Sequence, residues 1–563
     1  MKKNIFKNHI GELVAAIVIG LLEVLALSLF YKDSLAFWFV SFGNVLLLIG
    51  AWIVFSALFY VLFRLFLFLT DRLVPTKKKG RKHFWFALLV LLIFWLPWLI
   101  AFYPGSASYD MMYQVTQING GILLNGHHPP FATMVMGLVS NIGWMISHGP
   151  NLGLFLYILL QTLICAVAAA YMIAQMQRIG ISTAFQMIVL GYFAITPLWG
   201  GAMQTGIKDI LFTGVFLLFM TFSMQLFLPL RKTDGTVRFP AGKWILYGIC
   251  IVVLCLYRNG IILILVPTLV IFFFCGDKSR GWRKNFVLTA VISLALVLIF
   301  GNVVQRVYHT KTETAEALSI PFQQTARDIR DHAEELTPQQ QEVIEKTFNL
   351  EDYRKLGKAY YRYASDPVKV HYLWWATDEQ GAMLKEYLKV WGQRLGKRPM
   401  TYMEATLSNT FGYYTITPKI TPEKYGAGTM VQFGVDTLAS EDAVKASEGR
   451  LDESYIPHQA ESMQGFASFL TKWHGLWQKI PVLNLLLKCG TYGLILLIIT
   501  IHFAKKKNKR VLLAIPLILL YLMAMASPLN EHIRYVLPAV ASLPLVVAAC
   551  YGQEEKHTLE DKT

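Results

Sequence analysis

The stretch FWFALLVLLIFWLPWLIAFYPGSASYD, residues 84–110, decides the fold class of this chain. Residues 84–102 carry no charged side chain, and their number is close to the roughly 20 residues that a helix needs to cross a bilayer. Pro104 and Gly105 then break the helix, so Asp110 comes to lie at the edge of the membrane. The stretch therefore predicts a membrane helix that is followed at once by a carboxylate at the membrane surface.

Similar apolar runs fill most of the remaining chain. Of the 563 residues, 55% are hydrophobic and only 16% are charged, whereas soluble domains contain about 25% charged residues. This composition excludes a large soluble enzyme. The sequence predicts an all-α polytopic membrane protein with about twelve transmembrane helices, near residues 11–31, 35–63, 84–102, 152–176, 183–199, 207–228, 244–258, 261–276, 285–303, 482–503, 511–527 and 533–551.

The net charge of +16 is distributed unevenly along the chain. Residues 304–480 contain 21 Lys/Arg and 23 Asp/Glu, so the basic excess lies in short connectors beside the apolar runs. Such a distribution indicates membrane topology and not a nucleic-acid partner. It predicts a multi-pass protein of the plasma membrane whose two termini are cytoplasmic, together with the basic connectors 1–7, 71–83, 231–243, 277–284 and 505–510.

The topology argument also fixes the expected domains. A full crossing by residues 130–147 would put the basic connectors on opposite faces, so this stretch is expected to be a surface or re-entrant helix at the outer face. The expected organisation is an N-terminal transmembrane module 1–303 with an outer loop 103–151 that holds the active site, an extracytoplasmic, mainly helical domain 304–481, C-terminal transmembrane helices 482–551 and a cytoplasmic tail 552–563.

Three further features concern the extracytoplasmic domain and the cysteines. A helix is expected to start at Thr337, with this residue as N-cap and Pro338 in the first turn, and another over residues 378–395. Residues 319–327 are polar on one helical face, which either faces a pocket or belongs to an ordinary amphipathic helix. All six cysteines lie in or beside apolar segments, so no disulfide framework is expected.

Ionisable residues are scarce on the predicted outer face outside this domain. Lys32 and Asp33 share a tight turn and are expected to be only solvated. The remaining charged residues occupy four separate turns, and charged groups at membrane depth usually mark a functional site. They are Asp110, Lys208, Asp209, Arg258, Glu531 and Arg534.

Most of these charged residues, and the nearby pair of histidines, have both an ordinary structural interpretation and a functional one. Asp110 is either an N-cap or a general base. The segment His127-His128-Pro129-Pro130 is either a surface turn or a source of a phosphate contact, a proton relay or a metal ligand. Lys208, Arg258 and Arg534 either extend to the membrane surface singly or gather as an anion site, with Asp209 as an ion-pair partner.

In this order, the motifs resemble the GT-C superfamily of integral membrane glycosyltransferases, in particular the protein O-mannosyltransferase and aminoarabinose-transferase type. The resemblance covers residues 84–303 and 482–551, and the chain is similar to an uncharacterised bacterial family within that superfamily. It depends on Tyr109-Asp110, His128-Pro129-Pro130 before a surface helix, Lys208-Asp209 at a span entrance, Arg258-Asn259-Gly260 and Arg534-Tyr535.

The resemblance implies a polyprenyl-phosphate-linked sugar donor and an inverting transfer to a glycan, lipid or protein acceptor of the cell envelope. Asp110 would be catalytic, and Lys208, Arg258 and Arg534 would bind the donor phosphate. The pocket would be lined by Tyr109, His127, His128, Asp209, Glu531 and Tyr535. Many relatives have an Asp-Glu pair where this chain has Asp110-Met111, so a divalent metal stays a possible cofactor and the acceptor type stays open.

Two other classes of protein fit part of the pattern. A transporter or lipid flippase of envelope glycan precursors would also contain many spans with charged residues, but such proteins often have repeated halves, and this sequence shows no clear internal repeat. An O-antigen ligase or polymerase would perform related chemistry with a different order of loops.

Overall fold

The computed structural model describes residues 3–75, 83–119, 124, 126–227, 230–231, 237–308, 315–372, 378–418, 420, 433, 441, 444–445, 453–527 and 529–552. In these residues the regular structure is helical except for two short strand pairs. Strands β1 (Ser106–Ala107) and β2 (Thr205–Gly206) are parallel, and β3 (Leu230–Arg231) and β4 (Val237–Arg238) are antiparallel. All of the predicted tail 552–563 except its first residue lies outside the described residues, as do parts of the connectors 71–83 and 231–243.

Eight helices in the described part of the chain are long and apolar enough to cross a membrane. They are α1 (Lys3–Lys32), α2 (Phe42–Leu73), α3 (Phe84–Ala101), α5 (Pro130–Ser147), α6 (Pro150–Arg178), α9 (Lys208–Phe227), α12 (Arg280–Tyr308) and α24 (Ile533–Tyr551). The helices α7 (Thr183–Ile195) and α8 (Pro197–Met203) form an apolar pair bent by 54°, which is either a broken span or a re-entrant loop.

The predicted count of about twelve spans is not confirmed. Helices α10 (Ala241–Tyr257), α11 (Ile262–Cys275) and α22 (Cys489–Lys505) are apolar but shorter than the roughly 20 residues of a full crossing. The predicted span 511–527 consists of a 3-10 helix, η7 (Lys509–Ala514), followed by the short helix α23 (Ile515–Met525). Hydropathy alone did not predict where these helices end.

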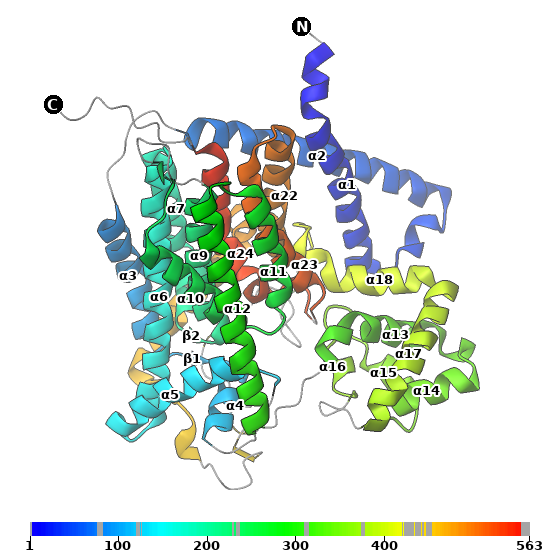
Figure 1. The fold of residues 1–563 in the computed structure, drawn as a ribbon. Helices are drawn as coiled ribbons and strands as arrows, with labels where there is room; N and C mark the ends of the chain where they lie inside the picture. Colours follow the sequence, from blue (N-terminus) through cyan, green and yellow to red (C-terminus); the bar gives the residue numbers. More distant parts are fainter. Residues whose placement is uncertain are drawn as a thin grey trace, which may run out of the picture.

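Helix α5 is the stretch for which a surface position is expected. By length and composition it qualifies as a span, although its mean hydropathy of 1.2 is the lowest of the eight. Figure 1 shows it lying obliquely across one end of the bundle, close to α4 (Tyr109–Ile118) and β1. Its place relative to a bilayer stays a prediction.

The opposite end of the bundle brings together the basic connectors. Figure 1 shows that α1 begins and α24 ends at this end of the molecule. Tyr551 at the end of α24 donates to Asp71 at the end of α2 (2.7 Å). Glu12 in α1 pairs with His502 (3.1 Å) at the end of α22. The predicted cytoplasmic connectors 71–83 and 505–510 therefore start from one end of the bundle.

Helices α9 and α24 form the centre of the bundle. Both are buried along most of their length, whereas α2 and α12 expose most of their apolar side chains. The mean hydropathy of α2 and α12, 2.6 for each, exceeds the 2.0 of α9 and the 1.8 of α24, as expected when outer helices face lipid and central helices contact other helices. Both central helices begin at the end of the bundle where β1 and β2 lie.

A separate helical layer, here called the inserted domain, follows α12 in the chain. It contains α13 (Ser319–His332), α14 (Pro338–Phe348), α15 (Arg354–Ala359), α16 (Asp366–Lys369), α17 (Asp378–Lys397) and α18 (Pro399–Thr410). Figure 1 shows most of these helices beside the bundle, with α18 nearest to it. Their aromatic core includes Phe322, Phe348, Tyr372 and Tyr387. The expected helix starting at Thr337 is confirmed with a full capping box, as is the helix at 378–395.

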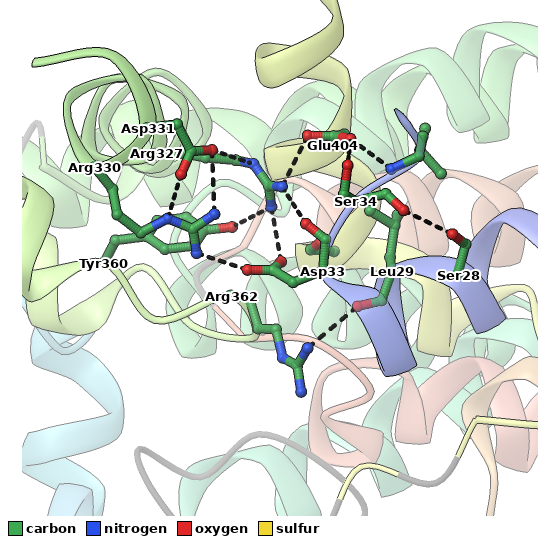
Figure 2. Close-up of polar contacts among 12 residues, drawn as sticks. Ser28, Leu29, Asp33, Ser34, Arg327, Arg330, Asp331, Tyr360, Arg362 and Glu404 are labelled. Carbon is green, nitrogen blue, oxygen red and sulfur yellow. Dashed lines mark hydrogen bonds and ion pairs between the residues drawn. The ribbon is translucent and has the colours of Figure 1, made fainter. Parts of the chain in front are cut away.

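The inserted domain contacts the first helical hairpin through buried ion pairs, shown in Figure 2. Arg327 of α13, with only 1% of its side chain exposed, binds Asp33 Oδ1 at 3.0 Å and Glu404 Oε2 of α18 at 2.8 Å. Arg330 binds the second Asp33 oxygen at 2.7 Å. The prediction that Asp33 is only solvated is therefore wrong, because its partners lie almost 300 residues away in the sequence. Arg327, in the polar stretch 319–327 of α13, therefore points towards Asp33 and Glu404.

The last part of the predicted extracytoplasmic region packs against the end of α3. In α20 (Gln464–Lys479), Ala467 and Leu470 contact Trp98 and Phe102 at the end of α3. The other side of α20 exposes Phe469 and Trp473. This segment lies beside the bundle and does not contribute to the aromatic core of the inserted domain.

Candidate active site

The strand pair β1–β2 places Asp110 next to Lys208. Ser106 pairs with Thr205 and Ala107 with Gly206, so the chain segments that lead into α4 and α9 run parallel. Ser108 caps α4 by accepting from Met111 N and also donates to Gly206 O at 2.9 Å. As a result, Lys208 Nζ lies 3.4 Å from Asp110 Oδ2, although the two residues belong to different helices.

Arg534 contacts the same carboxylate from a third helix. Its Nη1 lies 3.1 Å from Asp110 Oδ2, and its Nε lies 3.6 Å from Asp209 Oδ2. Arg258, which follows α10, lies 3.8 Å from Asp209 Oδ1 and donates to Tyr535 O at 3.3 Å. We call Asp110, Lys208, Asp209, Arg258 and Arg534 the charged cluster. With three cations and two carboxylates, the cluster has a net charge of +1.

The paired histidines border this cluster. His128 is buried, and Lys208 Nζ lies 3.1 Å from its Nδ1. The rings of His127 and His128 are 4.5 Å apart, and the His127 carbonyl accepts from Asn259 at 3.3 Å. The segment before α5 is therefore fixed between the Lys208 side chain and the turn that carries Arg258.

The remaining predicted residues lie at different distances from the cluster. The Tyr535 ring lies 5.3 Å from the Arg534 guanidinium and 5.8 Å from that of Arg258. Glu531 is buried at a positive φ of 54° and packs against Gly412, so it lies behind the start of α24. The Tyr109 side chain is 54% exposed, and none of the ion pairs of the cluster includes it.

Charge and burial set the protonation of the two groups outside the spans. Burial alone would raise the pKa of Asp110, but Arg534 and Lys208 outweigh it and hold this pKa well below the ordinary value. Burial and the charge of Lys208 hold the pKa of His128 well below its ordinary value. At neutral pH, Asp110 is therefore a carboxylate and His128 a neutral ring whose Nδ1 accepts from Lys208.

Three helices direct their N-termini at the charged cluster. Asp110 lies in the first turn of α4, Lys208 and Asp209 in that of α9, and Arg534 in that of α24. The N-terminal end of a helix carries a partial positive charge of about half a unit, which favours an anion. Together with the net charge of +1, this arrangement suits a phosphate.

An apolar cavity opens beside Arg534. Its wall is formed by side chains of α8, α9 and α24 and by the ends of β1 and β2, namely Ser108, Leu198, Ala202, Thr205, Ile207, Ile210, His532, Ile533, Arg534 and Leu537. Most of these side chains are hydrocarbon, and the charged Arg534 lies at one side. The cavity therefore presents a mainly apolar wall directly beside the charged cluster.

The family model that matches this chain covers residues 119–563 and is described as a family of unknown function, DUF6020. The chain belongs to the DUF6020 family. The part matched by the DUF6020 model includes Lys208, Asp209, Arg258 and Arg534, while Asp110 precedes it. No curated protein sequence matches this chain.

Two solved structures are similar to this chain. They are the crystal structures of ArnT from Cupriavidus metallidurans in the apo state and bound to undecaprenyl phosphate, with sequence identities of 12% and 13%. Each match covers 82% of this chain and 77% of the ArnT chain, with TM-scores of 0.31 and 0.30. Because both TM-scores are below 0.5, this similarity carries no argument about the site.

The described residues include no group of three or more His, Cys, Asp or Glu side chains placed to hold a metal ion.

The sequence analysis did not identify the uncharged residues that shape the site. Gln161 of α6 is fully buried and donates to Met203 O at 3.1 Å and to Thr205 O at 2.6 Å. It therefore fixes β2, and with it the start of α9. An amide within an apolar helix is the signal that could have identified it.

Proposed function

We propose that this chain is an integral membrane glycosyltransferase that takes a sugar from a polyprenyl-phosphate donor and transfers it, with inversion, to a cell-envelope acceptor. One observation carries the proposal: Lys208 and Arg534 both lie against the same oxygen of Asp110, at 3.4 and 3.1 Å. Two cations held together by a single carboxylate form a site that a phosphate can occupy in its place.

Competition between the donor and Asp110 links binding to catalysis. In the free chain the two cations keep Asp110 ionised and make it a weak base. A donor phosphate that takes Lys208 and Arg534 removes these partners, which raises the proton affinity of Asp110. The carboxylate then becomes an effective base only when the donor is bound.

The transfer step follows from this arrangement. The oxygen of the acceptor hydroxyl bonds to the anomeric carbon while Asp110 accepts the proton of that hydroxyl. The bond from the anomeric carbon to the phosphate oxygen breaks on the opposite face of the sugar. The polyprenyl phosphate leaves with the bonding electrons, and Lys208 and Arg534 offset its charge. Arg258, through Asp209, adds to the positive field around the leaving group.

The surroundings of the cluster support an amphipathic donor. The apolar cavity beside Arg534 would take the first isoprenoid units. A second cavity, between α4 and α5, includes Met111 and Asn119 and the stacked rings of Trp144 and Tyr455, 4.7 Å apart. Because Met111 is the next residue after Asp110, this second cavity is the candidate acceptor site.

The phosphate site is tested by binding of a polyprenyl monophosphate to the purified protein in detergent micelles. We expect Lys208→Ala and Arg534→Ala each to weaken binding by about tenfold or more, as expected for loss of a charge-assisted contact. Lys507→Ala, at the opposite end of the bundle, is the matched control and should bind like the parent. Parental affinity in both cluster variants would remove the phosphate-site assignment.

The same assay gives a sharper test of Asp110. We expect Asp110→Asn to bind the polyprenyl monophosphate more tightly than the parent, because the competing carboxylate is gone. The variant should nevertheless fail to transfer sugar, so cells that carry it should accumulate the lipid-linked donor as a deletion strain does. Asp352→Asn, an exposed carboxylate of the inserted domain, is the control. Normal envelope glycans in the Asp110→Asn strain would exclude Asp110 as the base and would favour the transporter alternative.

A further inference from the structure

The turn that precedes Arg534 is held from outside the bundle. Tyr413, which follows α18, donates from its hydroxyl to Leu529 O at 2.8 Å, and the same hydroxyl accepts from His532 N at 3.3 Å. Ala364, just before α16, forms a β-bridge with Leu529. Both ends of this turn are therefore hydrogen-bonded to segments that belong to the inserted domain or continue from it.

Asn530 lies at the middle of this turn, is fully buried, and has three hydrogen bonds. Its Nδ2 donates to Ser408 O at 2.7 Å, its Oδ1 accepts from Gly412 N at 2.9 Å, and its backbone N donates to Tyr363 O at 2.9 Å. An amide side chain is required, because one end must donate and the other must accept. Tyr363 and Ser408 lie in the inserted domain, and Gly412 follows its last helix, α18.

The packing around Asn530 leaves little room for movement. A Cβ on Gly412 would lie 2.4 Å from Glu531 Cβ, so the Gly412 backbone packs directly against the Glu531 side chain. Glu531 itself has a left-handed φ of 54°, which directs the chain into α24. Arg534 lies in the first turn of that helix, four residues after Asn530. A shift of the turn would therefore move the guanidinium relative to Asp110.

We propose that Asn530 is a positioning residue that fixes Arg534, so that the inserted domain sets the geometry of the phosphate site without contacting the donor. This inference rests on the proposed role of Arg534 in donor binding. The same domain is also held on the first hairpin, where Arg327 binds Asp33 and Glu404 of α18 (Figure 2). The inserted domain thus connects two parts of the bundle and orients the start of α24.

Asn530→Asp provides a test that depends on pH. An ionised carboxylate at this position cannot donate to Ser408 O, but a protonated one can donate there and still accept from Gly412 N. Burial raises the pKa of such a carboxyl, which brings its protonation into an accessible range. Glu531, His532 and Tyr413 are the titratable neighbours, and because they are also present in the parent, the parent's pH profile serves as the reference.

We expect Asn530→Asp to bind a polyprenyl monophosphate about tenfold or more weakly than the parent at pH 8, the equivalent of one lost buried hydrogen bond, and to recover at pH 5. Asn530→Ala should bind weakly at both pH values, and the exposed Asn349→Asp should behave as the parent. The Asn530→Asp protein is prepared at pH 5, moved to pH 8 and returned, and recovery of binding after the return shows that it remained folded.

The outcomes separate this inference from the proposed function. If Arg534→Ala weakens binding while both Asn530 variants bind as the parent, the positioning role is overturned and the phosphate site stands. If Asn530→Asp is as weak as Asn530→Ala at pH 5, the hydrogen bonds of the amide are not the cause and the inference is also overturned. If Arg534→Ala binds as the parent, the proposed function itself fails.

Discussion

At the scale of single residues, Asp110 has two different environments in one reaction cycle. Without donor, its Oδ2 lies within 3.4 Å of both Lys208 and Arg534. With donor, the phosphate would take these cations. The proton affinity of the Asp110 carboxylate would thus be low in the free protein and higher when the donor is bound.

The pH dependence of transfer should show this change. The pKa of free Asp110 lies well below its ordinary value, so an acid limb from this residue in kcat/KM should lie below the ordinary pH of about 4. Donor binding removes the cations and raises this pKa, so the acid limb of kcat should lie at higher pH than that of kcat/KM. Initial rates measured from about pH 3 to 8, with stability of the protein checked at each pH, test this expectation. Coincident limbs would contradict the competition between phosphate and Asp110.

Charged residues within apolar sequence indicated the candidate site, whereas the uncharged Gln161 was missed. The structure brings Asp110, Lys208, Asp209, Arg258 and Arg534 together, as the sequence pattern suggested, because burying a charge requires a partner. Whether these residues have the expected catalytic and binding roles stays a prediction. Asp33 was misjudged because its local sequence resembles any solvated turn, and its partner Arg327 belongs to a separate domain.

At the scale of secondary-structure elements, a strand pair of four residues aligns the helices α4 and α9. Gln161 supports it by donating to the carbonyls of Met203 and Thr205. The sequence predicted α9 as part of the span 207–228, and α4 only through the N-cap interpretation of Asp110. It did not predict the strand pair, because two-residue strands have no periodicity to read. The relative position of Asp110 and Lys208 therefore could not be derived from the sequence.

Loss of the Gln161 amide should disturb this alignment. We expect Gln161→Leu to destabilise the protein by about 1–3 kcal/mol, since the carbonyls of Met203 and Thr205 each lose a buried hydrogen bond. It should also weaken binding of a polyprenyl monophosphate through displacement of Lys208. Thermal unfolding in detergent and the binding assay check the two effects. The exposed Gln464→Leu, at the start of α20, is the control, and equal behaviour of the two variants would show that the amide has no such role.

At the scale of the whole molecule, buried ion pairs fix the inserted domain to the first hairpin. Arg327 lies between Asp33, Glu404 and Asp331 at 3.0, 2.8 and 3.4 Å. Removing one partner of a buried ion pair typically costs about 3–5 kcal/mol. Arg330 would still bind Asp33 and Asp331, so Glu404 loses most from removal of Arg327. The partial exposure of Asp33 and Asp331 places the expected cost near the lower end of this range.

Arg327→Ala should therefore lower the unfolding temperature and expose the junction between the domain and the bundle to protease. Arg354→Ala, which removes a solvent-exposed pair with Glu334 in the same domain, should leave both unchanged. Limited proteolysis in detergent, followed by fragment mass analysis, identifies the junction. A proteolytic pattern identical to that of the parent would show that these ion pairs do not hold the domain in place.

The insertion of a whole domain between α12 and α22 also has a consequence for biosynthesis. The ribosome delivers Asp110, Lys208, Asp209 and Arg258 first, and these four residues carry no net charge. Arg534 emerges only after the inserted domain has been made, and it supplies the one positive charge in excess. A chain that stalls before α24 thus lacks this excess charge, so incomplete copies in the membrane would bind an anionic lipid more weakly than the finished protein does.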